Sequence, residues 1–156
     1  MNREIKFRAY DTGNKLMHYD VEFIRSGREN NDWIIFKSDK QTLKDDKVFD
    51  NPFFSAQIKI MQFVGVKDIN GKNIYEGDIV RWGHLDGWSK ERNHRYATVE
   101  LDPDIQFKLL FCIDSNTTQK KQDRHIFRFG SFAYRETEKY LEVVGNIFEN
   151  PELLEH

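Results

Sequence analysis

Apolar and polar residues alternate in short runs along most of this chain, and residues that favour turns separate the runs. The clearest alternating run extends from Ile58 to Val64, and such alternation is typical of a strand with one face on a core. No amphipathic period long enough for a full-length helix is present. The pattern predicts a mostly β fold with little helix. Further strand candidates lie at 5–10, 16–19, 33–36, 79–82, 97–101, 107–113, 126–129, 132–134 and 141–148.

Turn-forming residues divide these runs. Asp11–Lys15 and Asn70–Gly71 combine Asp or Asn with Gly, which favours tight hairpin turns. Pro151 favours one short helical turn near the C-terminal end. Many short strands joined by turns predict a small barrel or sandwich. Loops are expected at 25–32, 37–47 and 83–96, a turn at 102–104, a linker at 115–123 and a hairpin around 130–131.

Composition narrows the function classes. Charged residues make up 32% of the chain and aromatic residues 14%, with 13 Phe, so a solvated surface over a large aromatic core is expected. The formal net charge is only −2. A general electrostatic attraction to nucleic acid is therefore not expected, and only a local basic patch could supply one.

The candidate chemistry is sparse. The one cysteine, Cys112, lies in an apolar run, so we expect a small buried hydrophobe rather than a nucleophile. His84 and His94 match no zinc-site spacing, and no P-loop, HExxH, nucleophile elbow or EF-hand motif is present. We therefore expect that the protein binds no cofactor and is not an enzyme. An enzyme with a dispersed catalytic site is the alternative.

Targeting features are also sparse. The first residues contain no apolar secretory segment, and no apolar run approaches the length of a membrane span. We therefore expect a cytoplasmic protein. The last residues, 154–156, resemble the start of a polyhistidine tag left by cloning, and His156 is given no functional role.

Three segments resemble the YopX family of phage and prophage proteins. They are Arg3–Asp11, Met61–Val80 and Val143–Leu154, and they follow the order and spacing of the family along the whole chain. The resemblance implies a small protein from a phage or prophage of a Gram-positive bacterium, acting in the host cytoplasm. It also implies a mainly β fold with an SH3-like barrel component, and it carries over no catalytic residue.

The expected organisation is a single YopX-like domain over residues 1–156. Residues 1–56 are expected to form an N-terminal β annex, with any break in the chain between Val48 and Gln57, where Asp50–Pro52 favours a turn. Residues 57–154 are expected to form the SH3-like barrel portion.

The central segment has a structural explanation. Gly77 can adopt a backbone conformation that a Cβ would oppose, and Asp78 can accept hydrogen bonds from N–H groups of the turn. Tyr75 is expected to pack its ring. The segment therefore predicts a tight turn that enters a strand, and this makes it a determinant of the fold.

Two segments rich in basic and aromatic residues are candidate binding surfaces. The first extends from Arg81 to Tyr96, and the second from Lys120 to Arg135. Cations bind phosphates and exposed aromatic rings stack on bases, so either segment could bind single-stranded nucleic acid. The alternative is that the aromatic residues are core and the charges solvate ordinary loops. The candidate partner-binding residues are Arg81, Trp88, Lys90, Arg92, Arg95, Lys120, Lys121 and Arg124.

The function that these observations favour is a non-enzymatic binding module for a protein partner, from the host or the phage. Exposed strand edges can add to a partner's sheet, and the near-zero net charge favours protein over nucleic acid. The alternatives are a nucleic-acid-binding module that uses the basic and aromatic loops, and a structural protein that assembles with its own copies.

Overall fold

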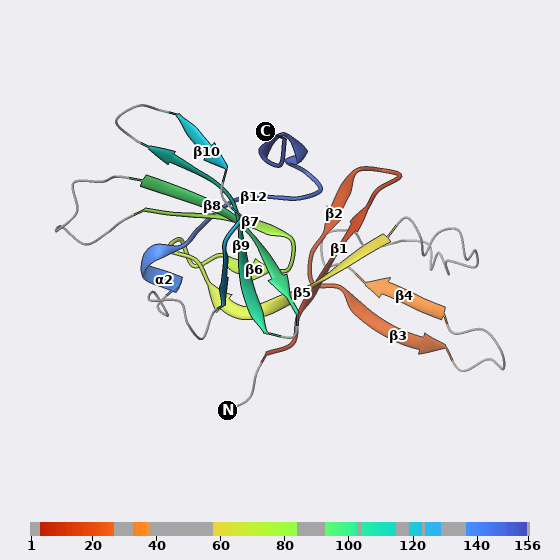
Figure 1. Ribbon diagram of the computed structural model, residues 1–156. Coiled ribbons are helices and arrows are strands. Elements are labelled where there is room, and N and C mark those ends of the chain that lie inside the picture. Colours follow the sequence, from red (N-terminus) through yellow and green to blue (C-terminus); the bar gives the residue numbers. More distant parts are fainter. Residues whose placement is uncertain are drawn as a thin grey trace. The chain divides into compact units, whose positions relative to one another are not determined.

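A computed structural model describes residues 4–26, 33–37, 58–83, 93–102, 104–114, 119–122, 124–128 and 137–155. The fold is mostly β with almost no helix, as the alternating pattern predicts (Figure 1). The strands are β1 (Phe7–Asp11), β2 (Leu16–His18), β3 (Glu22–Ser26), β4 (Trp33–Lys37), β5 (Ile58–Lys67), β6 (Asn73–Tyr75), β7 (Asp78–Trp82), β8 (Asn93–Leu101), β9 (Ile105–Asp114), β10 (Lys120–Gln122), β11 (Ile126–Arg128) and β12 (Glu142–Asn146). The helical segments are α2 (Thr137–Tyr140) and the 3-10 turn η2 (Pro151–Leu153).

The chain divides into two compact units, Met1–Phe63 and Val64–His156. The division falls inside β5, so this strand contributes residues to both units. The break expected near Asp50–Pro52 lies outside the described residues.

The first unit contains two antiparallel arrangements. Strand β1 pairs with β2 and with the first half of β5, and β3 pairs with β4. The turn predicted at 11–15 is confirmed, and the Asp11 carboxylate accepts hydrogen bonds from the N–H groups of Gly13 (2.9 Å) and Asn14 (3.1 Å). The loop predicted at 25–32 is wrong at its start, because Arg25 and Ser26 complete β3 in its pairing with β4.

The second unit is built on one curled antiparallel sheet with the strand order β10-β9-β8-β7-β12, and β11 also pairs with β9. In Figure 1, β8, β9 and β10 run side by side, as their pairing requires. Strands β8 and β9 form a long hairpin whose register runs from Asn93↔Asp114 to Leu101↔Ile105. Strand β8 is therefore longer than the predicted run at 97–101.

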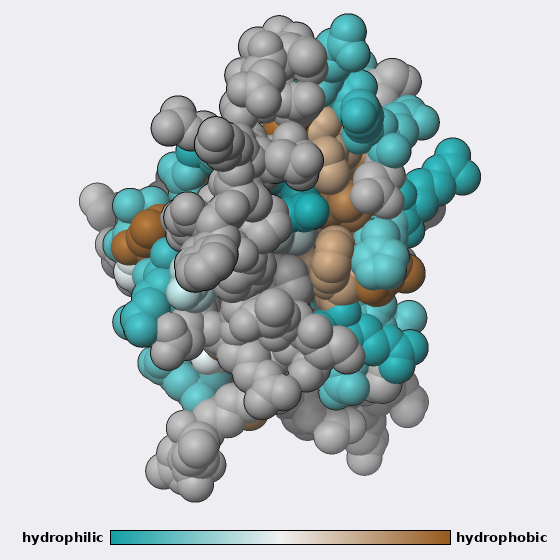
Figure 2. Space-filling model, turned by 60° about the vertical axis from the view of Figure 1, so that its left-hand side comes forward, coloured by the Kyte–Doolittle hydropathy of each residue, from teal (hydrophilic) through white to brown (hydrophobic). Residues whose placement is uncertain are grey.

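One face of the described residues is largely hydrophilic. In Figure 2, hydrophilic colours predominate among the coloured residues, and apolar residues form a strip right of centre and a smaller group at the left. The 32% of charged residues accounts for this surface.

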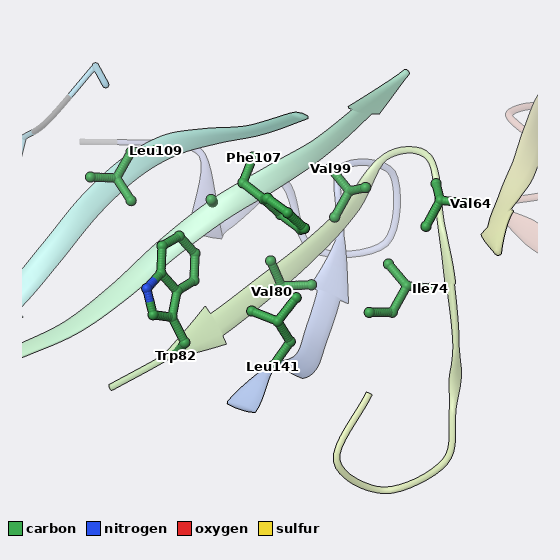
Figure 3. Close-up of a cluster of buried hydrophobic side chains, with 9 residues drawn as sticks. Val64, Ile74, Val80, Trp82, Val99, Phe107, Leu109 and Leu141 are labelled. Carbon is green, nitrogen blue, oxygen red and sulfur yellow. The ribbon is translucent and has the colours of Figure 1, made fainter. Parts of the chain in front are cut away.

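The core of the second unit lies on one face of the curled sheet. Trp82 lies edge-on to Phe107, with ring centroids 6.3 Å apart (Figure 3). Burying a large aliphatic side chain contributes about 1.5–3 kcal/mol relative to exposure, so this cluster is a major source of stability. The cluster consists of Val64, Ile74, Val80, Trp82, Ala97, Val99, Phe107, Leu109 and Leu141.

A buried carboxylate joins the β5–β6 turn to β12. Asp68 is 1% exposed. Its Oδ1 accepts hydrogen bonds from the N–H groups of Asn70 (2.9 Å) and Lys72 (2.8 Å), and its Oδ2 accepts one from the N–H of Val143 (3.0 Å). The Ile69 N–H also donates to the Leu141 carbonyl (2.8 Å). The central and closing segments of the chain, 75 positions apart, are thus held together by one side chain.

The predicted turn at Gly77 is confirmed. Gly77 has a φ of +78°, and the Asp78 Oδ2 accepts a hydrogen bond from the Tyr75 N–H (2.8 Å). The Gly77 N–H donates to the Val99 carbonyl (2.8 Å), and its carbonyl accepts from the Ile147 N–H (2.9 Å). Because the turn bonds to residues on either side of β7, the segment acts as a fold determinant.

A bulge and a tight turn form the end of β12. The register between β12 and β7 shifts between Val143 and Gly145, and a Cβ at Gly145 would lie 2.8 Å from the Asn150 Cγ. The Asn146 Oδ1 accepts hydrogen bonds from the N–H groups of Phe148 (3.0 Å) and Glu149 (2.9 Å). The helical turn predicted at Pro151 is confirmed as η2.

We expect Asp68→Asn to lower the free energy of unfolding by about 2–4 kcal/mol. A carboxamide offers one acceptor oxygen in place of two, and its NH₂ would then oppose a backbone N–H donor. Urea unfolding followed by circular dichroism measures the loss. The matched control is Asp104→Asn, at an exposed turn position, which should change stability by less than about 0.5 kcal/mol. Equal effects of the two substitutions would contradict this account of Asp68.

Candidate functional site

The structure places five of the eight candidate residues. Arg81 lies on β7, Arg95 on β8, Lys120 and Lys121 on β10, and Arg124 between β10 and β11. The other three, Trp88, Lys90 and Arg92, lie outside the described residues, as does the second strand of the hairpin expected around 130–131.

The two predicted loops are partly strand. The loop expected at 83–96 is wrong for residues 93–96, which begin β8, and the linker expected at 115–123 is wrong for residues 120–122, which form β10. In both places the polar sequence forms a strand because β9 supplies the pairing partner. Tertiary pairing overrides the weak local preference of such residues.

A row of side chains crosses the sheet on the face opposite the core. The cross-strand partners are Glu142↔Arg81, Arg81↔Tyr96 and Tyr96↔Phe111. Directly opposed residues share a face, and Trp82, next to Arg81, faces the core, so this row faces away from the core. The rings of Tyr96 and Phe111 are stacked with centroids 4.5 Å apart, and the Lys120 Nζ lies 4.7 Å from the centroid of the Phe111 ring.

Arg81 is engaged within the protein. Its Nε donates to the Glu142 Oε2 (3.1 Å), and its Nη2 donates to the same oxygen. The hydrogen bond to Glu142 raises the pKa of the Arg81 guanidinium above its ordinary value, and Tyr96 acts in the same direction. Among the described residues, Arg81 is therefore a candidate cation that already has an acidic partner.

Among the described strands, β10 and β11 together form the outer edge of the sheet. Both pair antiparallel with β9, but Lys120↔Ile113 and Ile126↔Lys108 differ by one residue in register. The Leu109 N–H donates to the His125 carbonyl (2.9 Å), so His125 also lies beside β9. Residues 120–122 and 124–128 thus follow one edge of β9 with a bulge between them, and we call these residues the basic edge.

The basic edge is positive and exposed. Between residues 119 and 128 the sequence holds four basic residues and one acidic residue. Lys120, Lys121, Arg124 and Arg128 are all exposed. This contrasts with a net charge of −2 for the chain as a whole. The cluster of cations is visible in the sequence. Its position on a sheet edge is not, because that position depends on the pairing with β9.

The aromatic side chains near these cations are mostly buried. Trp82 is 3% and Phe111 is 1% exposed, and Phe127 packs against the core, edge-on to Trp82 at 5.8 Å. The interpretation of Trp82 as core is confirmed. Within the described part of the chain, the basic edge therefore lacks an exposed Phe, Tyr or Trp ring on which bases could stack, and its exposed ring is the smaller imidazole of His125.

Other candidate chemistry is limited within the described residues. Cys112 is half-buried and packs against the core cluster, in keeping with its expected role as a small apolar side chain. No group of three or more His, Cys, Asp or Glu side chains that could hold a metal ion occurs in the described ranges. Over the same ranges, no helix has the length and apolar character needed to span a membrane.

We expect the ion pair of Arg81 with Glu142 to stabilise the folded protein. A double-mutant cycle of Arg81→Met and Glu142→Gln should give a coupling energy of about 0.5–1 kcal/mol, because two donors of Arg81 bond to one Glu142 oxygen but the pair is partly exposed. Urea unfolding of the four proteins measures it. A coupling energy of zero would contradict this role, and Arg81 would then remain a candidate for partner binding.

Comparison with known proteins identifies relatives of this chain. The model of a family described as YopX protein matches residues 6–155. Protein EF1440 from Enterococcus faecalis is 24% identical with a TM-score of 0.50, and the match covers 99% of this chain and 100% of that one. Protein yopX from Bacillus subtilis is 22% identical with a TM-score of 0.53, and the match covers 96% and 98%. At these identities the likeness concerns the fold. Among curated proteins, none matches this chain.

Proposed function

This chain belongs to the YopX family, and from its exposed basic edge we propose that it is a non-enzymatic module that binds a protein partner. The proposal includes the cytoplasm of a bacterial host as the place of action, and the resemblance to phage and prophage proteins supports this part of it. The partner in this proposal presents an acidic surface or segment.

The observation that carries the proposal is the charge of the basic edge. Lys120, Lys121, Arg124 and Arg128 are exposed along one edge of the sheet, while the whole chain is slightly acidic. A local positive surface attracts and orients an acidic partner, and it disfavours partners of like charge.

The aromatic residues favour protein over nucleic acid as the partner. Sequence-tolerant binding of single strands combines cations with exposed rings. Here the rings of Trp82, Phe111 and Phe127 contribute to packing. The cations alone are sufficient for charge complementarity with an acidic protein surface.

The basic edge also argues against assembly of identical copies through this part of the sheet. Two copies paired edge to edge would bring Lys120 and Lys121 of each close together. Lysines on an edge strand oppose such pairing, and natural sheets use them for this purpose. An acidic partner meets no such repulsion.

Charge reversal tests the proposal. We expect the Lys120→Glu/Lys121→Glu variant to lose proteins that the immobilised wild-type chain captures from bacterial extract, with captured proteins identified by mass spectrometry. Reversal should weaken an electrostatic complex by about tenfold or more. The captured proteins that are lost should contain acidic segments.

The matched control is Lys59→Glu/Lys67→Glu, which reverses two exposed lysines of β5. It changes the net charge by the same amount and should capture the same proteins as the wild type. If the β10 variant and the wild type capture the same proteins, the proposal is wrong. Loss of nucleic acid alone would instead support the nucleic-acid alternative.

A further inference from the structure

One exposed apolar side chain lies within the basic edge. Ile126 on β11 is 46% exposed. Its neighbour Phe127 packs against the core cluster. Because successive residues of a strand point to opposite faces, Ile126 and Arg128 point away from the core, on the outer face of the sheet.

Cations surround Ile126 on that face. Lys108 is its direct cross-strand partner on β9, and Arg128 follows two positions later on the same face. Lys108 and Arg128 are both exposed. The Glu100 Oε1 lies 3.8 Å from the Lys108 Nζ, at the long limit for an ion pair with both side chains exposed.

The same face continues toward β10. Gln122 opposes Phe111, which lies in the row that faces away from the core, so Lys120 and Gln122 share the outer face. Lys120 covers the Phe111 ring. The outer face of the basic edge thus presents Lys120, Gln122, Ile126 and Arg128 along its length, with an apolar group between cations.

The bulge determines how a partner can bind there. The one-residue change in register between β10 and β11 interrupts the backbone ladder of the edge. A bulged edge does not template a long continuous added strand. Recognition therefore depends on side chains, and the pattern of side chains determines which partner fits.

We propose that the outer face of the basic edge binds an extended acidic segment of a partner protein that carries a large aliphatic side chain between its carboxylates. The aliphatic side chain packs on Ile126, and the carboxylates pair with Arg128, Lys108 and Lys120. This inference rests on the proposed function and adds the chemistry of the bound segment. An apolar contact with a charged rim is the usual anatomy of a protein interface.

A random heptapeptide display library selected on the immobilised full chain tests the inference. We expect enriched peptides to combine Asp or Glu with Leu, Ile or Val. Synthetic versions of these peptides should bind about tenfold more weakly to Ile126→Ser and to Arg128→Glu, as measured by fluorescence polarisation. The second variant keeps the test valid if the first one fails to fold.

The matched controls change exposed residues elsewhere in the same unit. Ile69→Ser alters an isoleucine that is 54% exposed in the β5–β6 turn, and Lys67→Glu alters an exposed lysine of β5. Both should bind the selected peptides as tightly as the wild type does. Equal weakening by the controls would overturn the inference.

The remaining outcomes separate this inference from the proposed function. Acidic peptides with no aliphatic preference, unaffected by Ile126→Ser, would overturn the inference and leave a protein-binding module. A library with no enriched peptides would also overturn the inference. If the protein then bound a mixed-sequence single-stranded DNA, and Lys120→Glu/Lys121→Glu abolished that binding, the proposed function would be wrong too.

Discussion

The buried carboxylate of Asp68 is the constraint on which the second unit depends. A charged group that is 1% exposed is stable only when hydrogen bonds replace its water. Three backbone N–H groups supply them, two from its own turn and one from Val143 on β12. The turn, the last strand of the sheet and the core residue Leu141 between them are therefore fixed together.

This constraint acts at one end of the sheet, and the proposed binding residues lie at the other end. Asp68 bonds to Val143 on β12, the last strand in the order, and the Gly77 turn bonds to Val99 on β8 and to Ile147 just after β12. The basic edge lies at the other end, beyond β7, β8 and β9. The segments that identify the family thus maintain the fold, whereas the proposed binding residues lie where the sheet meets solvent. Substitutions at one end can change binding while the other end preserves the structure.

The sequence predicts the local parts of this arrangement. Alternation identifies β5, β7 and β12, and the residue types at Gly77 and Asp78 predict their turn, because these signals act over a few residues. The bond from Val143 to Asp68 has no local signal. Strand β10 also escapes prediction, since Lys120-Lys121-Gln122 is polar throughout and becomes a strand through its pairing with β9. The cations were found by composition, but their common edge follows from registers that only the folded chain shows.

Amide hydrogen exchange, followed residue by residue by NMR, tests the role of Asp68 most directly. If its carboxylate joins the turn to β12, the N–H groups of Asn70, Lys72 and Val143 exchange only when the whole second unit unfolds. They should then share one opening free energy with core amides such as that of Leu109. Exchange of the Asn70 and Lys72 amides at the rate of exposed turns, while Leu109 stays protected, would contradict the account.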